Sequence, residues 1–320
     1  MINDNTRIDR IYSFFNAIRG NNTPNEYQRV LAVLKKVMVI QECAQNELDY
    51  DELYELMLSV ATDFDIPNPF PEKRRFVDIY RTLQGFKELS WTDVLEYGDV
   101  KSKFRVPESI VDEMEKNFID GCQEVLIPEA EKFSPFLEKL VDTHSNSNFT
   151  LTTMDAFYYK VLNEMFDGNE RVDIKQTNIY QYEFTSEKYG LILSVPVFGV
   201  RDKAGESSEF ICRDYDMIAV ENLALHLRSD GILSIVLPAR ITFAGGNVKE
   251  LREFLQSMYC LKEISDLPSG IFDNTGVKTL LFTFTTGRTD EVTIKRFVFE
   301  DEDARKTGNK KLLVQDDTFV

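Results

Sequence analysis

Residues Tyr189–Gly199 read Y-G-L-I-L-S-V-P-V-F-G, which is the most informative stretch of the chain. The apolar run predicts a buried strand, and Pro196 ends it because proline lacks the backbone N–H that a strand ladder requires. The strand leads into the short loop Val195-Pro196-Val197-Phe198, which carries one aromatic ring and no polar side chain. The same pattern is typical of an ordinary buried strand end, so its meaning depends on the sequence around it.

The segments that follow alternate between helical and strand patterns. A helix end, an Asp-Gly turn and a strand closed by Pro238 come first, and a helix entered through a Gly pair comes next. The four segments are L-H-L-R-S-D-G-I-L-S-I-V-L-P (Leu225–Pro238), G-G-N-V-K-E-L-R-E-F-L (Gly245–Leu255), L-K-E-I-S-D-L-P-S-G-I-F (Leu261–Phe272) and T-G-V-K-T-L-L-F-T-F (Thr275–Phe284).

In this order the segments resemble the methyltransferase domain of type I restriction-modification M subunits, which are N6-adenine DNA methyltransferases. Upstream, F-R-V-P (Phe104–Pro107) is similar to the family's F-F-T-P loop, so the resemblance runs from Phe104 to Phe284. It implies an α/β fold with a seven-stranded class I methyltransferase-like (Rossmann-like) sheet. It also implies S-adenosylmethionine as the cofactor and DNA adenine as the target.

The resemblance marks the loop at Val195–Phe198 as the counterpart of the family's catalytic motif, Asn-Pro-Pro-Phe. In the family, the Asn amide oxygen and a proline carbonyl accept hydrogen bonds from the amine of a flipped-out adenine, and the Phe stacks on the base. Here Pro196 and Phe198 remain, but Val195 has no side-chain acceptor and Val197 replaces the second proline. We therefore expect no catalytic residue in this degenerate motif.

The cofactor-binding loop of the family also lacks its counterpart. Family members follow the first strand with an acidic residue and a Gly-rich loop, because only glycine lets the backbone approach the cofactor closely. In this chain Ile127 stands at the acidic position, and the glycine positions hold bulky residues. The degenerate loop comprises Ile127, Pro128, Glu129, Glu131, Lys132 and Phe133.

Two further family acids are displaced or replaced. The ribose-binding acid should end the next strand, where the chain reads Thr152-Thr153-Met154 and Asp155 comes two residues late. A last acid aligns with Asn178. Because three elements are altered together, we expect no bound cofactor and interpret the domain as a pseudoenzyme.

Composition indicates a globular protein of ordinary apolarity. The chain has 320 residues, 43% of them hydrophobic, and a formal net charge of −17. Such a charge disfavours contact with a phosphate backbone by this chain alone, since that affinity comes largely from Lys and Arg. We expect DNA to be bound through a specificity subunit or module, with other restriction or defence subunits as partners.

Cysteines and histidines give no sign of a metal site. Cys43, Cys122, Cys212 and Cys260 are scattered, which is typical of reduced thiols in a cytoplasmic protein. His144 and His226 have no Cys, Asp or His at ligand spacing. No apolar run is long enough to cross a bilayer, and the polar N-terminus does not resemble a signal peptide, so we expect no membrane contact.

Periodicity predicts three parts. Residues 1–100 form a helical domain, in which Asn25 is a candidate cap and the prolines of Asp65–Pro71 break the pattern. Residues 101–290 form the methyltransferase-like α/β domain. Residues 291–320 form a strand and a charged tail that could lead into a further module. The expected strands of the α/β domain are Gln123–Ile127, Asn148–Thr152, Arg171–Lys175, Leu191–Val195, Ile232–Leu237, Leu261–Ser265 and Thr279–Thr285.

Three functions remain open at this stage. The first is a catalytically impaired adenine methyltransferase-like subunit that acts as scaffold or DNA-recognition component of a bacterial restriction-modification or anti-phage defence complex. The second is an active site-specific DNA (adenine-N6) methyltransferase with a divergent motif, which would bind S-adenosylmethionine with the help of Glu129 or Glu131. The third is a methyltransferase fold reused for another ligand.

Overall fold

The structure is a computed structural model and describes residues 24–44, 47–84, 89–96, 105–203, 209–273, 275–301 and 310–319. The chain divides into two compact units. The first comprises the residues up to Lys103 together with Lys160–Asp167, and the second comprises Phe104–Tyr159 and Gly168–Val320. None of the helices in the described ranges combines the length and apolarity that a bilayer crossing requires.

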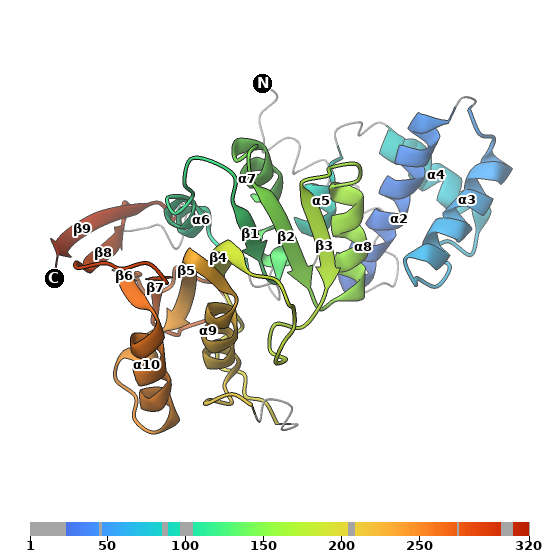
Figure 1. Cartoon of the computed structure of the whole chain (residues 1–320). Coiled ribbons are helices and arrows are strands. Elements are labelled where there is room, and N and C mark those ends of the chain that lie inside the picture. The colour runs from blue at the N-terminus through green and yellow to red at the C-terminus, as the bar shows by residue number, and fades with distance from the viewer. Residues whose placement is uncertain are drawn as a thin grey trace. The chain divides into compact units, whose positions relative to one another are not determined.

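The first unit is helical, as the sequence predicts. Its elements are α2 (Pro24–Cys43), α3 (Tyr50–Asp63), α4 (Lys73–Gln84), α5 (Trp91–Glu96) and the end of α8 (Ala156–Met165) (Figure 1). Asp49 caps the start of α3 with a capping box. Its side chain accepts a hydrogen bond from the N–H of Glu52, and the Glu52 side chain accepts one from the N–H of Asp49. The prediction of Asn25 as a cap is wrong, because α2 already begins at Pro24, where the missing N–H costs no helical hydrogen bond.

The second unit is built on one nine-stranded sheet in the order β3-β2-β1-β4-β5-β7-β6-β8-β9. Five neighbouring strands, β3 to β5 in that order, are parallel, and β7 runs antiparallel between β5 and β6. The strands are β1 (Glu124–Ile127), β2 (Asn148–Thr153), β3 (Val172–Gln176), β4 (Tyr189–Ser194), β5 (Leu227–Pro238), β6 (Cys260–Asp266), β7 (Thr279–Thr285), β8 (Thr293–Phe299) and β9 (Leu312–Phe319).

All seven strand positions expected from the sequence are strands, so the α/β class is confirmed, but the count of seven is wrong. The sheet continues through β8, which pairs parallel with β6, to β9, which pairs antiparallel with β8. The apolar pattern of β8 predicts a strand. The sequence does not predict β9, because it contains Asp316 and Asp317 and aspartate is rare in strands. Its strand conformation depends on the pairing with β8.

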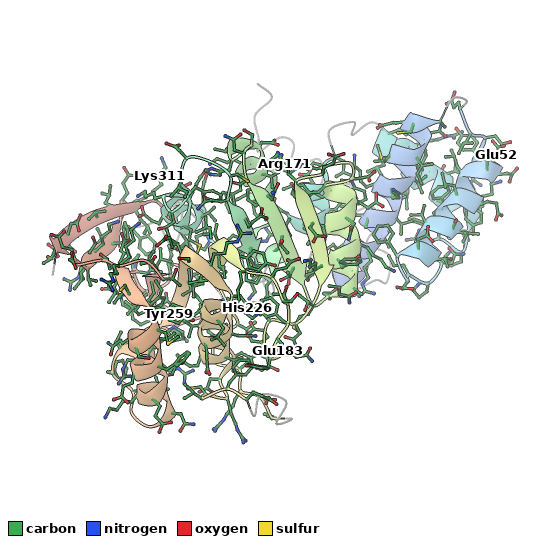
Figure 2. All side chains as sticks on the ribbon, in the orientation of Figure 1. Glu52, Arg171, Glu183, His226, Tyr259 and Lys311 are labelled. Carbon is green, nitrogen blue, oxygen red and sulfur yellow. The ribbon has the colours of Figure 1, made fainter. Side chains whose placement is uncertain are left out.

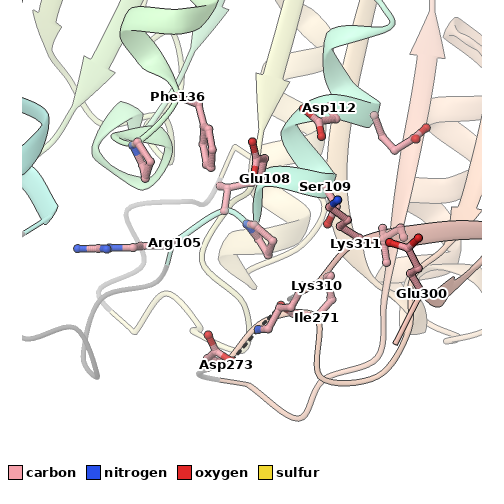
Figure 3. Close-up of a pocket in the computed structure, with 15 residues that line it drawn as sticks. Arg105, Glu108, Ser109, Asp112, Phe136, Ile271, Asp273, Glu300, Lys310 and Lys311 are labelled. Atoms are coloured by element: carbon pink, nitrogen blue, oxygen red, sulfur yellow. Dashed lines mark hydrogen bonds and ion pairs between the residues drawn. The ribbon is translucent and has the colours of Figure 1, made fainter. Parts of the chain in front are cut away.

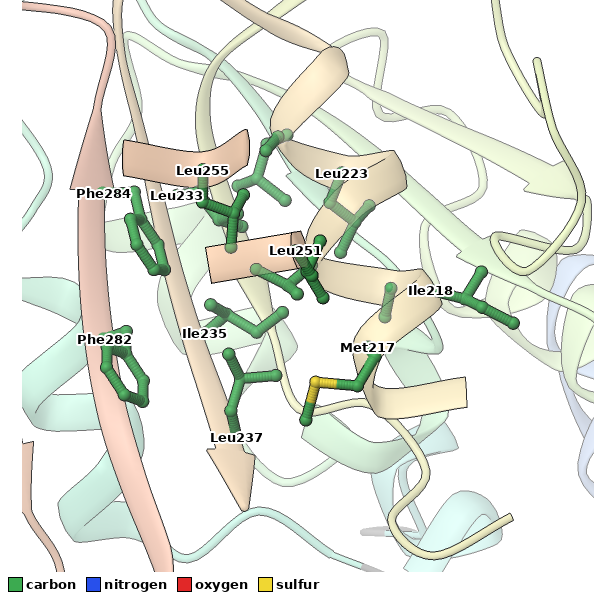
Figure 4. Packing of buried hydrophobic residues seen from close by; sticks show 14 of the residues in the cluster. Met217, Ile218, Leu223, Leu233, Ile235, Leu237, Leu251, Leu255, Phe282 and Phe284 are labelled. Carbon is green, nitrogen blue, oxygen red and sulfur yellow. The ribbon is translucent and has the colours of Figure 1, made fainter. Parts of the chain in front are cut away.

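Helices cover the sheet and connect its strands. They are α6 (Glu108–Glu115), the 3-10 turn η1 (Ala130–Phe133), α7 (Leu137–Thr143), α8, α9 (Tyr215–Leu225), the 3-10 turn η2 (Ala239–Thr242) and α10 (Asn247–Met258). Side chains of α9 and α10 meet those of β5 and β7 in one apolar core (Figure 4). Leu233, Leu251 and Met217 are fully buried there, and each such side chain contributes about 1.5–3 kcal/mol through removal from water.

The expected turn at Asp230-Gly231 lies inside β5, where the pairing with β4 shifts register between Tyr189 and Leu191. Asp230 has φ +60°. A Cβ on Gly231 would lie 2.9 Å from the carbonyl oxygen of Arg228, so this position requires glycine. The Asp-Gly pair therefore forms an irregularity within a long strand.

Candidate functional site

The candidate site lies at the carboxyl ends of β1 and β4. These two strands are neighbours, but the chain continues from β1 toward β2 on one side and from β4 toward β5 on the other. Ligands of open α/β sheets bind where the strand order reverses in this way. The two segments that the sequence singles out, the loop after Ile127 and the loop after Ser194, therefore meet at the expected place.

The loop after β1 is packed into the protein. Glu129 has φ +50°, a left-handed conformation that costs a non-glycine residue about 1–2 kcal/mol. The chain then forms η1, in which Ala130 and Phe133 are fully buried, as Ile127 is at the end of β1. The backbone thus keeps a glycine-like conformation at Glu129, while apolar side chains fill the space next to it.

A buried polar cluster joins this loop to the loop after β4. The Lys132 ammonium lies 2.7 Å from Glu129 Oε2 and donates a hydrogen bond of 2.9 Å to the carbonyl oxygen of Val195. The Tyr180 hydroxyl donates to the same Glu129 oxygen at 2.8 Å and accepts from the N–H of Val197 at 3.0 Å. We call Glu129, Lys132 and Tyr180 the bridging cluster, since they connect the two loops through buried side chains.

Burial keeps the Tyr180 hydroxyl protonated. Burial, together with the nearby Glu129 carboxylate, raises the pKa of Tyr180 well above its ordinary value, so the hydroxyl keeps its proton and donates to Glu129. The ring of Tyr180 is stacked on that of Tyr215, with centroids 4.3 Å apart. A protonated phenol is suited to holding backbone and is not poised to act as a base.

Glu131 lies beside the cluster and differs from it. Part of the side chain is exposed, but its Oε2 atom is enclosed and has no hydrogen-bond partner. Burial of the carboxyl, followed by the charge of Glu129, raises the pKa of Glu131 to about 7. Among the residues of the degenerate loop, Glu131 is the one with an unmet acceptor.

The loop after β4 is mostly closed. Val195 is 1% exposed and Pro196 is buried, whereas Val197 and Phe198 are half-buried. The ring of Phe198 packs edge-on against that of Phe272, with centroids 5.8 Å apart. The ring of Phe198 therefore keeps part of its surface exposed.

Asp155 and Asn178, which the resemblance aligns with family acids, accept hydrogen bonds from backbone. Asp155 Oδ1 accepts from the N–H of Phe157 at 2.8 Å and caps the start of α8. Asn178 Oδ1 accepts from the N–H of Tyr180 at 2.9 Å and so fixes the turn that presents Tyr180 to Glu129. Thr153 is buried at the end of β2, and Met154 is 48% exposed.

Two groups that organise this edge could not be recognised from any sequence motif. Tyr180 is one, because its partners lie 51 and 17 residues away in the chain. The other is the ion pair between Arg240 and the fully buried Asp216, whose charged atoms lie 2.6 Å apart. Arg240 forms a second ion pair with Asp214, at 3.1 Å. Asp216 also accepts from the N–H of Gly199 at 3.3 Å, so this pair holds the end of the loop that carries Phe198.

A separate cavity of about 630 Å³ lies between α6 and the start of β9 (Figure 3). Arg105, Glu108, Phe136 and Lys311 are among its lining residues. Lys310 donates to Asp273 at 2.6 Å and to the carbonyl oxygen of Ile271 at 2.7 Å. The lining includes both positively and negatively charged side chains, so its charge does not indicate a class of ligand. It includes no member of the bridging cluster.

The two histidines and the buried Cys212 take structural positions. Both ring nitrogens of His226, at the end of α9 in Figure 2, face backbone carbonyls, those of Asn222 and Thr185. His144 stacks on Phe118 with a centroid distance of 3.5 Å. Burial raises the pKa of the Cys212 thiol to about 11, which disfavours a nucleophilic thiolate. Within the described ranges, His, Cys, Asp and Glu form no group of three or more suited to a metal ion.

Comparison with solved structures identifies the fold as that of a methyltransferase. The methyltransferase subunit of the type I restriction-modification system from Streptococcus thermophilus superposes with a TM-score of 0.68 at 12% identity, covering 98% of this chain and 90% of that one. A putative class I S-adenosylmethionine-dependent methyltransferase from Listeria monocytogenes gives 0.59 at 11% identity, covering 89% and 96%. At these identities the likeness establishes the fold.

Part of the sequence also matches a family model. Residues 170–318 match the family model described as N-6 DNA Methylase. The modification subunit of a putative type I restriction enzyme from Vibrio vulnificus gives a TM-score of 0.56 at 18% identity, and this chain, 80% of which is covered, spans 57% of that subunit's length. A comparison with curated proteins found no match. The predicted resemblance to type I modification subunits of the N6-adenine DNA methyltransferase family is thus confirmed.

Proposed function

We propose that this chain is a catalytically impaired DNA adenine methyltransferase-like subunit that serves as scaffold or DNA-recognition component of a cytoplasmic bacterial restriction-modification or anti-phage defence complex. The bridging cluster is the observation that carries this proposal. A working site must admit the cofactor next to the β1 loop and an adenine next to the β4 loop. Here Lys132 crosses from one loop to the other and is tied to Glu129 and to the Val195 carbonyl.

The residues present do not fit S-adenosylmethionine as the family holds it. Family members need backbone without side chains at this loop, and Lys132 and Phe133 add two large buried side chains. Admitting the cofactor would require breaking a buried ion pair, which costs several kcal/mol because each charge would lose its partner in a poorly solvated environment.

The catalytic loop supports the same proposal. Val195 offers only its backbone carbonyl, and Lys132 already donates to that oxygen. An adenine amine would therefore find no side-chain acceptor at this position. The proposed partners, a DNA-specificity subunit or module and other defence subunits, follow from the family resemblance and from the net charge of −17, which disfavours DNA binding by this chain alone.

One observation favours the alternative of an active methyltransferase. Glu131 Oε2 is enclosed without a partner, and a buried acceptor of this kind is satisfied in most proteins. A ligand with an amino group would supply the missing donor.

Calorimetric titration of the full chain with S-adenosylmethionine distinguishes the catalytically impaired subunit from the active methyltransferase. A scaffold gives no measurable heat at ligand concentrations up to the millimolar range. Micromolar binding would overturn the proposal, and its loss in Glu131→Gln would then assign the amino group to Glu131. An active methyltransferase from the same family, titrated in parallel, controls for the cofactor preparation.

A further inference from the structure

We infer that a cavity beside the end of α9 binds a small organic ammonium compound. The cavity has a volume of about 500 Å³ and lies between the end of α9 and the segment 182–188, which leads into β4. His226 and Glu183, which Figure 2 labels, are among its lining residues and come from these two sides. We call this cavity the ammonium site.

The ammonium site lies away from the sheet edge that carries the bridging cluster. Tyr189 begins β4 and Leu227 begins β5, and these two residues are partners in the parallel ladder. Lys188 and His226, which directly precede them, both line the cavity. The ammonium site therefore belongs to the amino edge of the sheet, whereas open α/β sheets bind their usual ligands at the carboxyl edge.

Asn222 gives this cavity a buried acceptor that the described residues leave unused. The side chain is fully buried and lines the cavity. Its Nδ2 donates to the carbonyl oxygens of Ile179 at 2.7 Å and Gln181 at 2.8 Å, so the amide cannot be turned over without bringing its oxygen against two acceptors. Oδ1 is enclosed and has no hydrogen-bond partner. Because most buried polar atoms have a partner, this oxygen indicates that a bound molecule supplies a donor.

The imidazole and the ammonium group of the lining are both engaged with backbone. His226 Nδ1 lies 2.7 Å from the carbonyl oxygen of Asn222 and Nε2 lies 2.9 Å from that of Thr185, so neither ring nitrogen is free for a ligand. Lys188 Nζ donates to the carbonyl oxygen of Leu225, at the end of α9 where helix carbonyls carry partial negative charge. Neither group satisfies Asn222 Oδ1, so the ligand itself must bring the donor.

A carboxylate and an aromatic ring favour a cationic donor. Glu183 is exposed and forms no ion pair with any described residue. Tyr182 is 49% exposed, and its ring packs edge-on against that of Phe210, with centroids 5.8 Å apart. An ammonium group donates to amide and carboxylate oxygens and is attracted to the face of a tyrosine ring. It therefore suits Asn222, Glu183 and Tyr182 together.

Binding at this site acts on the bridging cluster through the backbone. Ile179 and Gln181, whose carbonyl oxygens accept from Asn222, are the chain neighbours of Tyr180, which donates to Glu129. A ligand that holds Asn222 Oδ1 restrains the amide, and the amide restrains the peptide groups on both sides of Tyr180. The ligand should therefore raise the melting temperature of the chain, since it binds the folded state alone.

Calorimetric titration of the full chain with putrescine, a linear diammonium compound, tests the inference at constant ionic strength. Saturable binding at one site is expected, and 1,4-butanediol, a neutral compound of the same length, should not bind. Glu183→Gln should weaken putrescine binding about fivefold, because a partly exposed ion pair is lost. The matched control is Glu250→Gln, which removes an exposed carboxylate on α10 outside the cavity and should leave binding unchanged.

Nuclear magnetic resonance of the ¹⁵N-labelled chain locates the bound ligand. The side-chain amide signals of Asn222 should shift as putrescine is added, and they should stay in place with butanediol or with sodium chloride of the same ionic strength. An unshifted Asn222 signal, equal weakening in Glu183→Gln and Glu250→Gln, butanediol binding as tight as that of putrescine, or no putrescine binding would each overturn the inference.

Discussion

At the scale of single residues, Lys132 determines whether the two loops stay joined. Its ammonium and the Glu129 carboxylate are both less than one-tenth exposed, so removing one partner leaves a buried charge. We predict that Lys132→Met lowers the free energy of unfolding by about 3–5 kcal/mol, measured by urea denaturation. Lys139→Met is the control, because Lys139 is mostly exposed and lies 4.0 Å from Asp112. Equal losses in both variants would contradict a special role for Lys132.

Glu131 gives a prediction about pH. Its pKa is about 7 in the folded chain and near 4.5 when unfolded, so the folded state holds the proton more tightly. Its contribution to stability is therefore fully present below about pH 4.5 and is lost as the pH rises through about 7. We predict that Glu131→Gln is more stable than the wild type at pH 8, by about 2–3 kcal/mol, and that this difference disappears at pH 4. A difference independent of pH would show that the carboxyl does not titrate as described.

Phe198 tests whether the adenine position is closed. The ring is half-buried against Phe272, so we predict that Phe198→Ala costs about 1–2 kcal/mol, less than the 3–5 kcal/mol typical of a fully buried phenylalanine. Phe272→Ala, at 3% exposure, should show that larger loss in the same thermal unfolding experiment. A normal melting temperature for Phe198→Ala combined with lost DNA binding by the assembled complex would instead indicate that the ring stacks on a base.

At the scale of elements, the sequence predicts the strands because each central one is an apolar run bounded by turn residues. Leu191, Ile192 and Leu193 are wholly buried, and no other assignment would remove them from water. Boundaries and edges are harder to predict. The strand β9 is defined by its register with β8, and the Asp230-Gly231 pair lies within a strand whose pairing tolerates a shift in register.

The sequence predicts where the candidate site lies, but not the side-chain contacts that form it. Motif order places the loops after Ile127 and Ser194 at one edge, because parallel strands end together. The bridging cluster depends on how far the Lys132 and Tyr180 side chains reach, and on a left-handed backbone at Glu129 that glycine usually provides. Periodicity contains no information about such contacts, so the sequence does not predict which side chains connect the two loops.

At the scale of the whole molecule, charge determines how the chain meets DNA. A net charge of −17 repels a phosphate backbone. We predict that the isolated chain binds duplex DNA weakly at near-physiological salt and that a specificity subunit tightens binding by at least tenfold.

Anisotropy titrations with and without the candidate specificity subunit check this prediction. The affinity of the assembly should fall steeply with salt, because the partner's cations release counterions from DNA. The specificity subunit alone is the necessary control, since binding as tight as that of the assembly would mean that this chain adds nothing. Tight, salt-resistant binding by the isolated chain would contradict the prediction, because an acidic protein has no electrostatic source for it.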